Sequence, residues 1–397
     1  MQNRAHPSIG AAPTTTARVW IDFAKGAAII LVVLYHASLF LSEIGLAGST
    51  PRLRAFLSFL PMAVFIFIAG LSARRSVGWS FPDLWRRRLA GLVYLYVLWS
   101  IIRVLFYLVV PHLRSTERSP TDLVTIILLP VWPTSSYWFV WALALLALIA
   151  WLVRLVPPPI QLACAGLLAI AFGTPGLLDS NNVGWDRVAQ NLFFFLAAVY
   201  GAPKIHRLVA QVRYWHVAAL ALLYAVLAML IIPLHLSRVP GLIFLEGNVA
   251  IALTVSASVV LARVRWLDFV SALGRASLVI YLLHLFVIAS VVAVIAPLAN
   301  DSFLMKFANL WPLVLAVIAI AVTLLLRRVL RRVSWLWVNP FRSRPFRSRP
   351  GRSLGDRRKP RTPISRQRAD NPATTPSGTP TSSTATSIPS APNVSQE

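Results

Sequence analysis

The sequence predicts an all-α membrane protein, a bundle of about ten transmembrane helices followed by a disordered C-terminal tail. Composition is the first reason, because 57% of the 397 residues are hydrophobic and the mean hydropathy is +0.69, above the values of soluble domains. The second reason is that the apolar residues form runs long enough to cross a hydrocarbon layer about 30 Å thick. Only a helix satisfies the backbone of such an isolated run in lipid.

Ten apolar runs are candidate spans, separated by loops that contain charged residues or prolines. They are residues 20–42, 56–73, 89–110, 136–156, 160–174, 189–203, 215–235, 243–262, 277–298 and 307–330. Three consecutive prolines, at 157–159, separate the fourth run from the fifth. The fifth and sixth runs are short for a complete crossing. The first run lacks the small-residue cleavage site of a signal peptide, so we expect it to be retained as a span.

The basic residues predict the orientation of the spans. One set of alternate loops is rich in Lys and Arg, and the positive-inside rule places that set in the cytoplasm. With an even number of spans, we expect both termini of this multi-pass protein of the inner or plasma membrane to be cytoplasmic. Because the charges lie between apolar runs and in the tail, the formal net charge of +25 does not predict a nucleic-acid partner.

Three segments follow from this pattern. Residues 1–17 form a short cytoplasmic N-terminal segment, residues 18–338 the transmembrane domain, and residues 339–397 the cytoplasmic tail. The tail is basic at first and then rich in Pro, Ser and Thr, a composition that cannot bury a core. Its basic half either lies on anionic lipid headgroups or only anchors the topology. We expect the residues after Val338 to be dispensable for chemistry.

The first span carries ionisable side chains along one face. In a helix of about 100° per residue, Asp22, Lys25, His36 and Glu43 lie on the same side. His36 lies about 16 Å beyond Lys25, near the middle of the hydrocarbon layer. An ionisable group is costly there, so we expect His36 to face other protein or a wet cavity. The single cysteine, Cys164, excludes intrachain disulfides and Cys-rich metal sites, and no Gly-rich phosphate loop is present.

Three segments, in this order, resemble the membrane acyltransferase-3 family, integral-membrane O-acyltransferases that modify surface glycans. They read IDFAKGAAIILVVLYH at 21–36, MAVFIFIAG at 62–70 and LGRASLVIYLLH at 273–284. The run SYWF at 136–139 is a weaker match. The chain departs from the family in carrying Lys25 where many relatives have Arg. It also has three contiguous arginines, at 86–88, where relatives often have spaced ones and a proline.

The resemblance implies transfer of a short acyl group, expected to be acetyl, from an acyl-CoA donor to a hydroxyl of a glycan or lipid-linked sugar. It implies acyl-CoA (acetyl-CoA) as a co-substrate, with no bound cofactor and no metal. His36 is the candidate general base, because histidine transfers protons readily near neutral pH. The alternative for His36 is a buried neutral side chain bonded to a neighbouring carbonyl.

Several polar residues are candidates for the two substrate sites. Those expected to bind the polyanionic donor are Asp22, Lys25, Arg74, Arg75, Arg86, Arg87 and Arg88, with Asp22 holding Lys25. Alternatively, the lysine only extends toward the membrane surface and the arginines only set the topology. Those expected to line the acceptor path are Tyr137, Trp138, Tyr281, His284 and Glu246. For these the alternatives are packing between helices, an interfacial aromatic belt and a helix end.

The competing function is a secondary transporter or a flippase for a glycan or lipid-linked precursor. It would use the same intramembrane charges as a substrate path. The sequence shows neither a half-to-half repeat nor a matched pair of Gly- or Pro-broken helices, which transporter folds commonly contain. We therefore expect an enzyme whose partners are membrane lipid, the donor and the acceptor.

Overall fold

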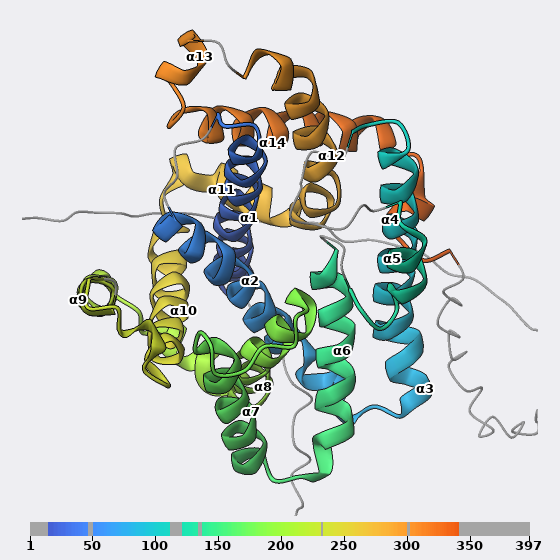
Figure 1. Cartoon of the computed structure of the whole chain (residues 1–397). Helices are drawn as coiled ribbons and strands as arrows, with labels where there is room; N and C mark the ends of the chain where they lie inside the picture. Colours follow the sequence, from blue (N-terminus) through green and yellow to red (C-terminus); the bar gives the residue numbers. More distant parts are fainter. Residues whose placement is uncertain are drawn as a thin grey trace, which may run out of the picture. The chain divides into compact units, whose positions relative to one another are not determined.

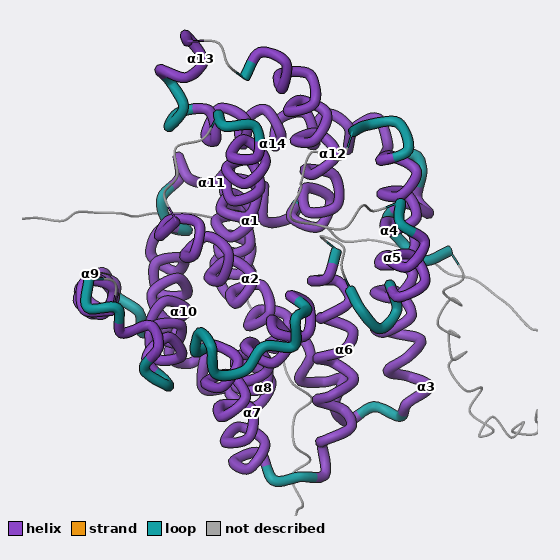
Figure 2. Tube along the Cα trace, in the orientation of Figure 1, coloured by secondary structure: helices purple, strands orange, loops and turns teal. Residues whose placement is uncertain are grey.

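The structure, a computed structural model, describes residues 15–46, 51–111, 121–133, 137–231, 233–299 and 302–340. Within these ranges all regular elements are helices (Figure 2). Nine helical segments of this part are long and apolar enough to cross a membrane, which confirms the predicted all-α, multi-span class. The expectations for residues 1–14 and for the tail from residue 341 fall outside the described residues.

The described helices follow the predicted order of spans. The helices that lie in the nine long apolar segments are α1 (Thr15–Glu43), α2 (Pro51–Ala73), α4 (Ala90–Tyr107), α6 (Trp138–Leu152), α8 (Val183–Ala210), α9 (Tyr214–Ile231), α10 (Leu242–Leu261), α12 (Ser277–Ile295) and α14 (Trp311–Leu330). The other helices are α3 (Phe81–Leu84), α5 (Leu123–Leu128), α7 (Pro158–Gly173), α11 (Asp268–Arg275) and α13 (Ser302–Lys306). A π-helical turn, Trp85–Leu89, joins α3 to α4 in one continuous span, Phe81–Tyr107.

The sixth predicted span differs most from its helix, whereas the fifth agrees with α7 to within two residues at each end. α8 is much longer than the predicted residues 189–203, because Asn182 starts it early. The Asn182 side chain accepts hydrogen bonds from the backbone N–H groups of Gly184 and Trp185. The helix then continues through Pro203, as membrane helices tolerate when neighbours support the backbone. α7 has 16 residues, which amounts to about 24 Å of helix and is short of a full crossing.

The helix α1 is the one around which the others pack. It contacts α2, α10, α11, α12 and α14, and it contributes side chains to both buried apolar clusters (Figure 1). Small residues make these approaches possible, since Ala24, Ala28 and Ala37 are all buried. By contrast, α9 packs mainly on α10 and keeps most of its apolar side chains exposed, as a lipid-facing helix does.

The backbones of α1 and α11 meet in direct contact. A Cβ atom on Gly274 would collide with the backbone carbonyl of Asp22, and one on Gly26 would collide with the carbonyl of Val270. Glycine is needed at both positions for its size. Because α12 follows α11 directly, this crossing determines where the residues of α12 meet α1.

Replacing Gly274 with Ala should therefore destabilise the protein. The added methyl group must displace the α1 backbone, and overpacking of this kind costs about 1–3 kcal/mol or more. We expect a lower thermal midpoint in detergent and a smaller yield of monodisperse protein. Gly173→Ala is the matched control, because a Cβ atom there meets nothing within 4 Å. Equal midpoints for the two variants would contradict the packing argument.

Candidate functional site

A cavity of about 680 Å³ lies between α1, α2, α4, α6, α8 and α12. Its volume is in the range of small-molecule sites, about 300–1,000 Å³. The lining comes from the N-terminal parts of α1, α4 and α12 and from the C-terminal parts of α2 and α8. Residues that follow α14 complete the wall. These helix ends lie together because the spans alternate in direction.

Basic side chains dominate the polar part of the lining. They are Lys25, Arg86, Arg87, Arg88 and His206. Among the described residues that line the cavity there is no Asp or Glu, and most of the others are apolar. Such a lining suits a ligand with several negative charges at one end and a weakly polar chain at the other.

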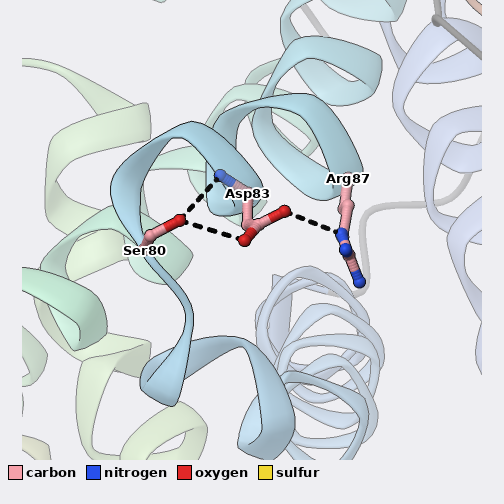
Figure 3. Close-up of polar contacts among 3 residues, drawn as sticks. All are labelled: Ser80, Asp83 and Arg87. Atoms are coloured by element: carbon pink, nitrogen blue, oxygen red, sulfur yellow. Dashed lines mark hydrogen bonds and ion pairs between the residues drawn. The ribbon is translucent and has the colours of Figure 1, made fainter. Parts of the chain in front are cut away.

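Local backbone geometry lets three neighbouring arginines reach the same cavity. They lie in the π-helical turn, which rotates less per residue than an α-helix and so spreads three neighbours over a narrower arc. Ser80 caps α3, because its hydroxyl donates to Oδ2 of Asp83 and accepts from the Asp83 backbone N–H. Oδ1 of Asp83 lies 3.1 Å from Nε of Arg87 and orients this arginine (Figure 3).

Arg88 is the arginine best placed to bind a buried anion. Its Nη2 donates to the backbone carbonyl of Ala69 at 3.2 Å, which holds the guanidinium against α2. Its Nε is buried and has no hydrogen-bond partner in the described structure. An unsatisfied buried donor is costly, and a phosphate oxygen in the cavity would satisfy it.

Aromatic side chains form the other end of the cavity. Tyr281 of α12 and Phe139 of α6 both line it, with their ring centroids 5.5 Å apart. Tyr137 packs against Tyr281, and its buried hydroxyl donates to the backbone carbonyl of Leu282 at 2.9 Å. These contacts hold the beginning of α6 against α12.

A pair of histidines lies directly beyond Tyr281. His284 is completely buried, and its ring centroid is 6.1 Å from that of Tyr281. Its Nε2 lies 3.3 Å from Nδ1 of His36 on α1. His36 remains partly exposed and is not among the cavity-lining residues, so the cavity approaches it through Tyr281 and His284. Within the described ranges, no group of three His, Cys, Asp or Glu side chains could hold a metal ion.

The charged residues predicted near the donor separate into two groups. Lys25 lines the cavity, whereas Asp22 forms its ion pair with Arg275 at 3.9 Å. Asp22 therefore points toward α11, and its described ion pair is with Arg275 and not with Lys25. Arg74 and Arg75 are exposed on a 3-10 helix, Arg74–Gly78, and are not part of the cavity lining.

The residues predicted for the acceptor path also separate. Tyr281 and His284 lie together with His36, as described above. Trp138 is half-buried beside Phe139 and does not line the cavity. Glu246 of α10 forms a side-chain hydrogen bond with Tyr224 of α9, away from this site.

Four of the lining residues that sequence analysis missed come from segments in which it predicted no site residue. They are His206 on α8 and Trp337, Val338 and Asn339 after α14. Composition predicted Asn339 to be part of the tail. In the structure, three hydrogen bonds attach residues 335–339 to α4. Tyr94 Oη donates to the carbonyl of Trp335 (2.9 Å), Trp99 Nε1 to that of Leu336 (3.0 Å), and Asn339 Nδ2 to that of Ala90 (3.4 Å). The aromatic run SWLW at 334–337 is the sequence signal that accompanies this docking.

Comparison with known proteins adds one match. The model of a protein family described as an acyltransferase domain matches residues 18–328. The matched range includes α1 from residue 18 onward, the arginine-bearing turn and both histidines, and it ends before the segment that docks on α4. No curated protein and no solved structure gives a significant match.

Deleting the residues after Val333 should destabilise the protein, whereas deleting those after Pro340 should not. The first truncation removes the three hydrogen bonds to α4, each of which contributes about 1 kcal/mol. We expect its thermal midpoint in detergent to fall by several degrees, with the longer truncated chain as the control. The docking argument is wrong if both truncated proteins unfold at the wild-type temperature.

Proposed function

The chain belongs to the membrane acyltransferase-3 family, and from this membership we propose that it is an O-acyltransferase. The acyl group, expected to be acetyl, moves from acyl-CoA to a hydroxyl of a glycan or lipid-linked sugar. One observation carries the proposal. The cavity joins a cluster of cationic side chains at one end to Tyr281 at the other, and Tyr281 adjoins the histidine pair.

The polarity of the cavity matches that of acyl-CoA. The donor carries phosphates at one end and a thioester at the end of a long, weakly polar arm. Lys25, Arg86 and Arg88 bind the phosphates, while Arg87 is partly neutralised by Asp83. The apolar lining then accommodates the arm, and the thioester lies at the Tyr281 end, next to the histidines.

We place the cationic end of the cavity on the cytoplasmic side. The loops rich in Lys and Arg belong to this end, so the positive-inside rule supports the assignment. Cytoplasmic acyl-CoA then enters directly. In this arrangement α7, although short, crosses as the tenth span, and both termini are cytoplasmic. Arg74 and Arg75, which are exposed and outside the lining, serve the topology in this arrangement.

His36 acts as the general base in the transfer. It removes the proton from the acceptor hydroxyl as the oxygen attacks the thioester carbonyl. The carbon–sulfur bond then breaks, and the departing thiolate takes the proton back from His36. The partial exposure of His36 supports an approach of the acceptor from outside the donor cavity.

Transfer itself can be tested with purified protein in lipid vesicles, labelled acetyl-CoA and cell-envelope glycans. We expect covalent label on the glycan and release of free CoA in equal amount. A boiled sample controls for spontaneous acetylation. Counterflow of glycan across sealed vesicles without covalent change would overturn the proposal in favour of a carrier.

Arg88→Gln should raise the KM for acyl-CoA by about 10–100-fold, the effect of losing one charge-assisted hydrogen bond. The kcat should change little, because the described contact of Arg88 is with the backbone of α2 and not with either histidine. Arg74→Gln is the control, since it removes the same charge from outside the lining. An equal rise in KM for both variants would show that general surface charge, and no specific site, attracts the donor.

His36→Ala should lower kcat by about 10²–10⁴-fold, the usual contribution of a general base. Acyl-CoA binding should be retained, because His36 is not part of the cavity lining. Steady-state transfer and equilibrium donor binding measure the two quantities separately. Transfer near the wild-type rate would end the assignment of His36 as the base.

A further inference from the structure

The two histidines meet from different helices near the middle of the bundle. Nε2 of His284 lies 3.3 Å from Nδ1 of His36, and the rings are inclined at 66° with their centroids 5.0 Å apart. The distance is at the long end for a hydrogen bond, as is common for catalytic contacts without substrate. His284 is completely buried and His36 is partly exposed. Only His36 is therefore placed to meet an incoming hydroxyl.

The backbone decides which nitrogen of His284 carries the proton. Its Nδ1 lies 2.9 Å from the carbonyl oxygen of Ile280 and 2.8 Å from that of Tyr281. Carbonyl oxygens only accept hydrogen bonds, so Nδ1 of His284 must be the protonated nitrogen. In the neutral ring, Nε2 then carries the lone pair, and it is this atom that faces His36.

The same argument orients His36. Its Nδ1 lies 2.9 Å from the carbonyl oxygen of Val32 and 3.3 Å from the lone pair on Nε2 of His284. Both neighbours accept, so Nδ1 of His36 carries the proton and Nε2 is the basic nitrogen. The opposite tautomers would place lone pairs against carbonyl oxygens in both rings. These four contacts therefore all favour one assignment.

We propose that His284 is a positioning residue for the acyl transfer, an inference that rests on the proposed function. By accepting the Nδ1 proton of His36, it directs the basic Nε2 toward the acceptor hydroxyl. When Nε2 takes that proton, the same contact stabilises the imidazolium that forms. The proton returns from Nε2 to the thiolate of the departing CoA, while the Nδ1 proton stays in place throughout.

A neutral acceptor suits this depth in the membrane. The Asp of a Ser-His-Asp triad performs the same orienting task, but a carboxylate here would add a buried charge. An imidazole locked by two carbonyls gives orientation without that cost. Tyr281 links the two sites, because its carbonyl holds His284 while its side chain lines the donor cavity.

Two substitutions separate the acceptor role of His284 from its packing. His284→Gln places an amide oxygen near the position of Nε2 and so keeps an acceptor for His36. His284→Asn places its amide near Nδ1 and leaves the Nε2 position empty. We expect His284→Asn to lower kcat by about 100-fold with a nearly unchanged donor KM. The kcat of His284→Gln should be at least about tenfold higher than that of His284→Asn.

His235→Asn is the matched control and should keep the wild-type rate. His235 is exposed, outside the cavity lining, and its φ of 52° is one that Asn tolerates well. Thermal midpoints in detergent show whether each variant is folded. If His284→Asn does not fold, the kcat of His284→Gln tests the proposal alone. The proposal then requires His284→Gln to keep at least about a tenth of the wild-type kcat.

The possible failures are distinguishable. If the wild-type protein transfers no acyl group, the proposed function fails. If it does, and His36→Ala is inactive, an equal loss of kcat in His284→Gln and His284→Asn overturns only the positioning role. A raised donor KM with unchanged kcat in both variants would also overturn it, because His284 would then act on donor binding.

Discussion

An imidazole inside the hydrocarbon layer must find its hydrogen-bond partners within the protein, and this need shapes the deep part of the bundle. His36 finds one partner on its own helix, at Val32, and one across the interface, at His284. The second contact exists only if α12 is held close to α1. The glycine crossing between α1 and α11 provides that closeness, because α12 begins where α11 ends. Two glycines at the crossing of α1 and α11 thus help to hold the histidine pair together.

Charged side chains lie in the part of the site where burying a charge costs least free energy. The basic side chains that line the cavity lie near helix ends, and the lining around Tyr281 is aromatic and apolar. Asp22, three residues before Lys25 on α1, pairs with Arg275 on α11. Lys25 therefore contributes its charge to the cavity lining. A ligand that is anionic at one end and nearly neutral at the other is complementary to this gradient.

Much of the architecture was predictable because lipid allows few alternatives. Apolar length identified the spans, and the spacing of Asp22, Lys25 and His36 placed them on one face of α1. The prediction failed where a local cap or a break in helical geometry mattered. Asn182 extends α8 beyond its apolar core, and the π-helical turn lets three arginines share one cavity. Neither effect appears in a pattern of hydrophobicity.

The sequence by itself determined that this chain spans a membrane repeatedly, because this follows from hydropathy. It also predicted a mid-depth position for His36 from helical periodicity. Only the tertiary structure decided which side chains meet. His284 reaches His36 from a helix about 250 positions away, and Trp337 to Asn339 return to wall the cavity after the last span. Arg74 and Arg75, equally basic in the sequence, are left outside. Such pairings depend on how helices cross, which is set by backbone contacts between distant segments.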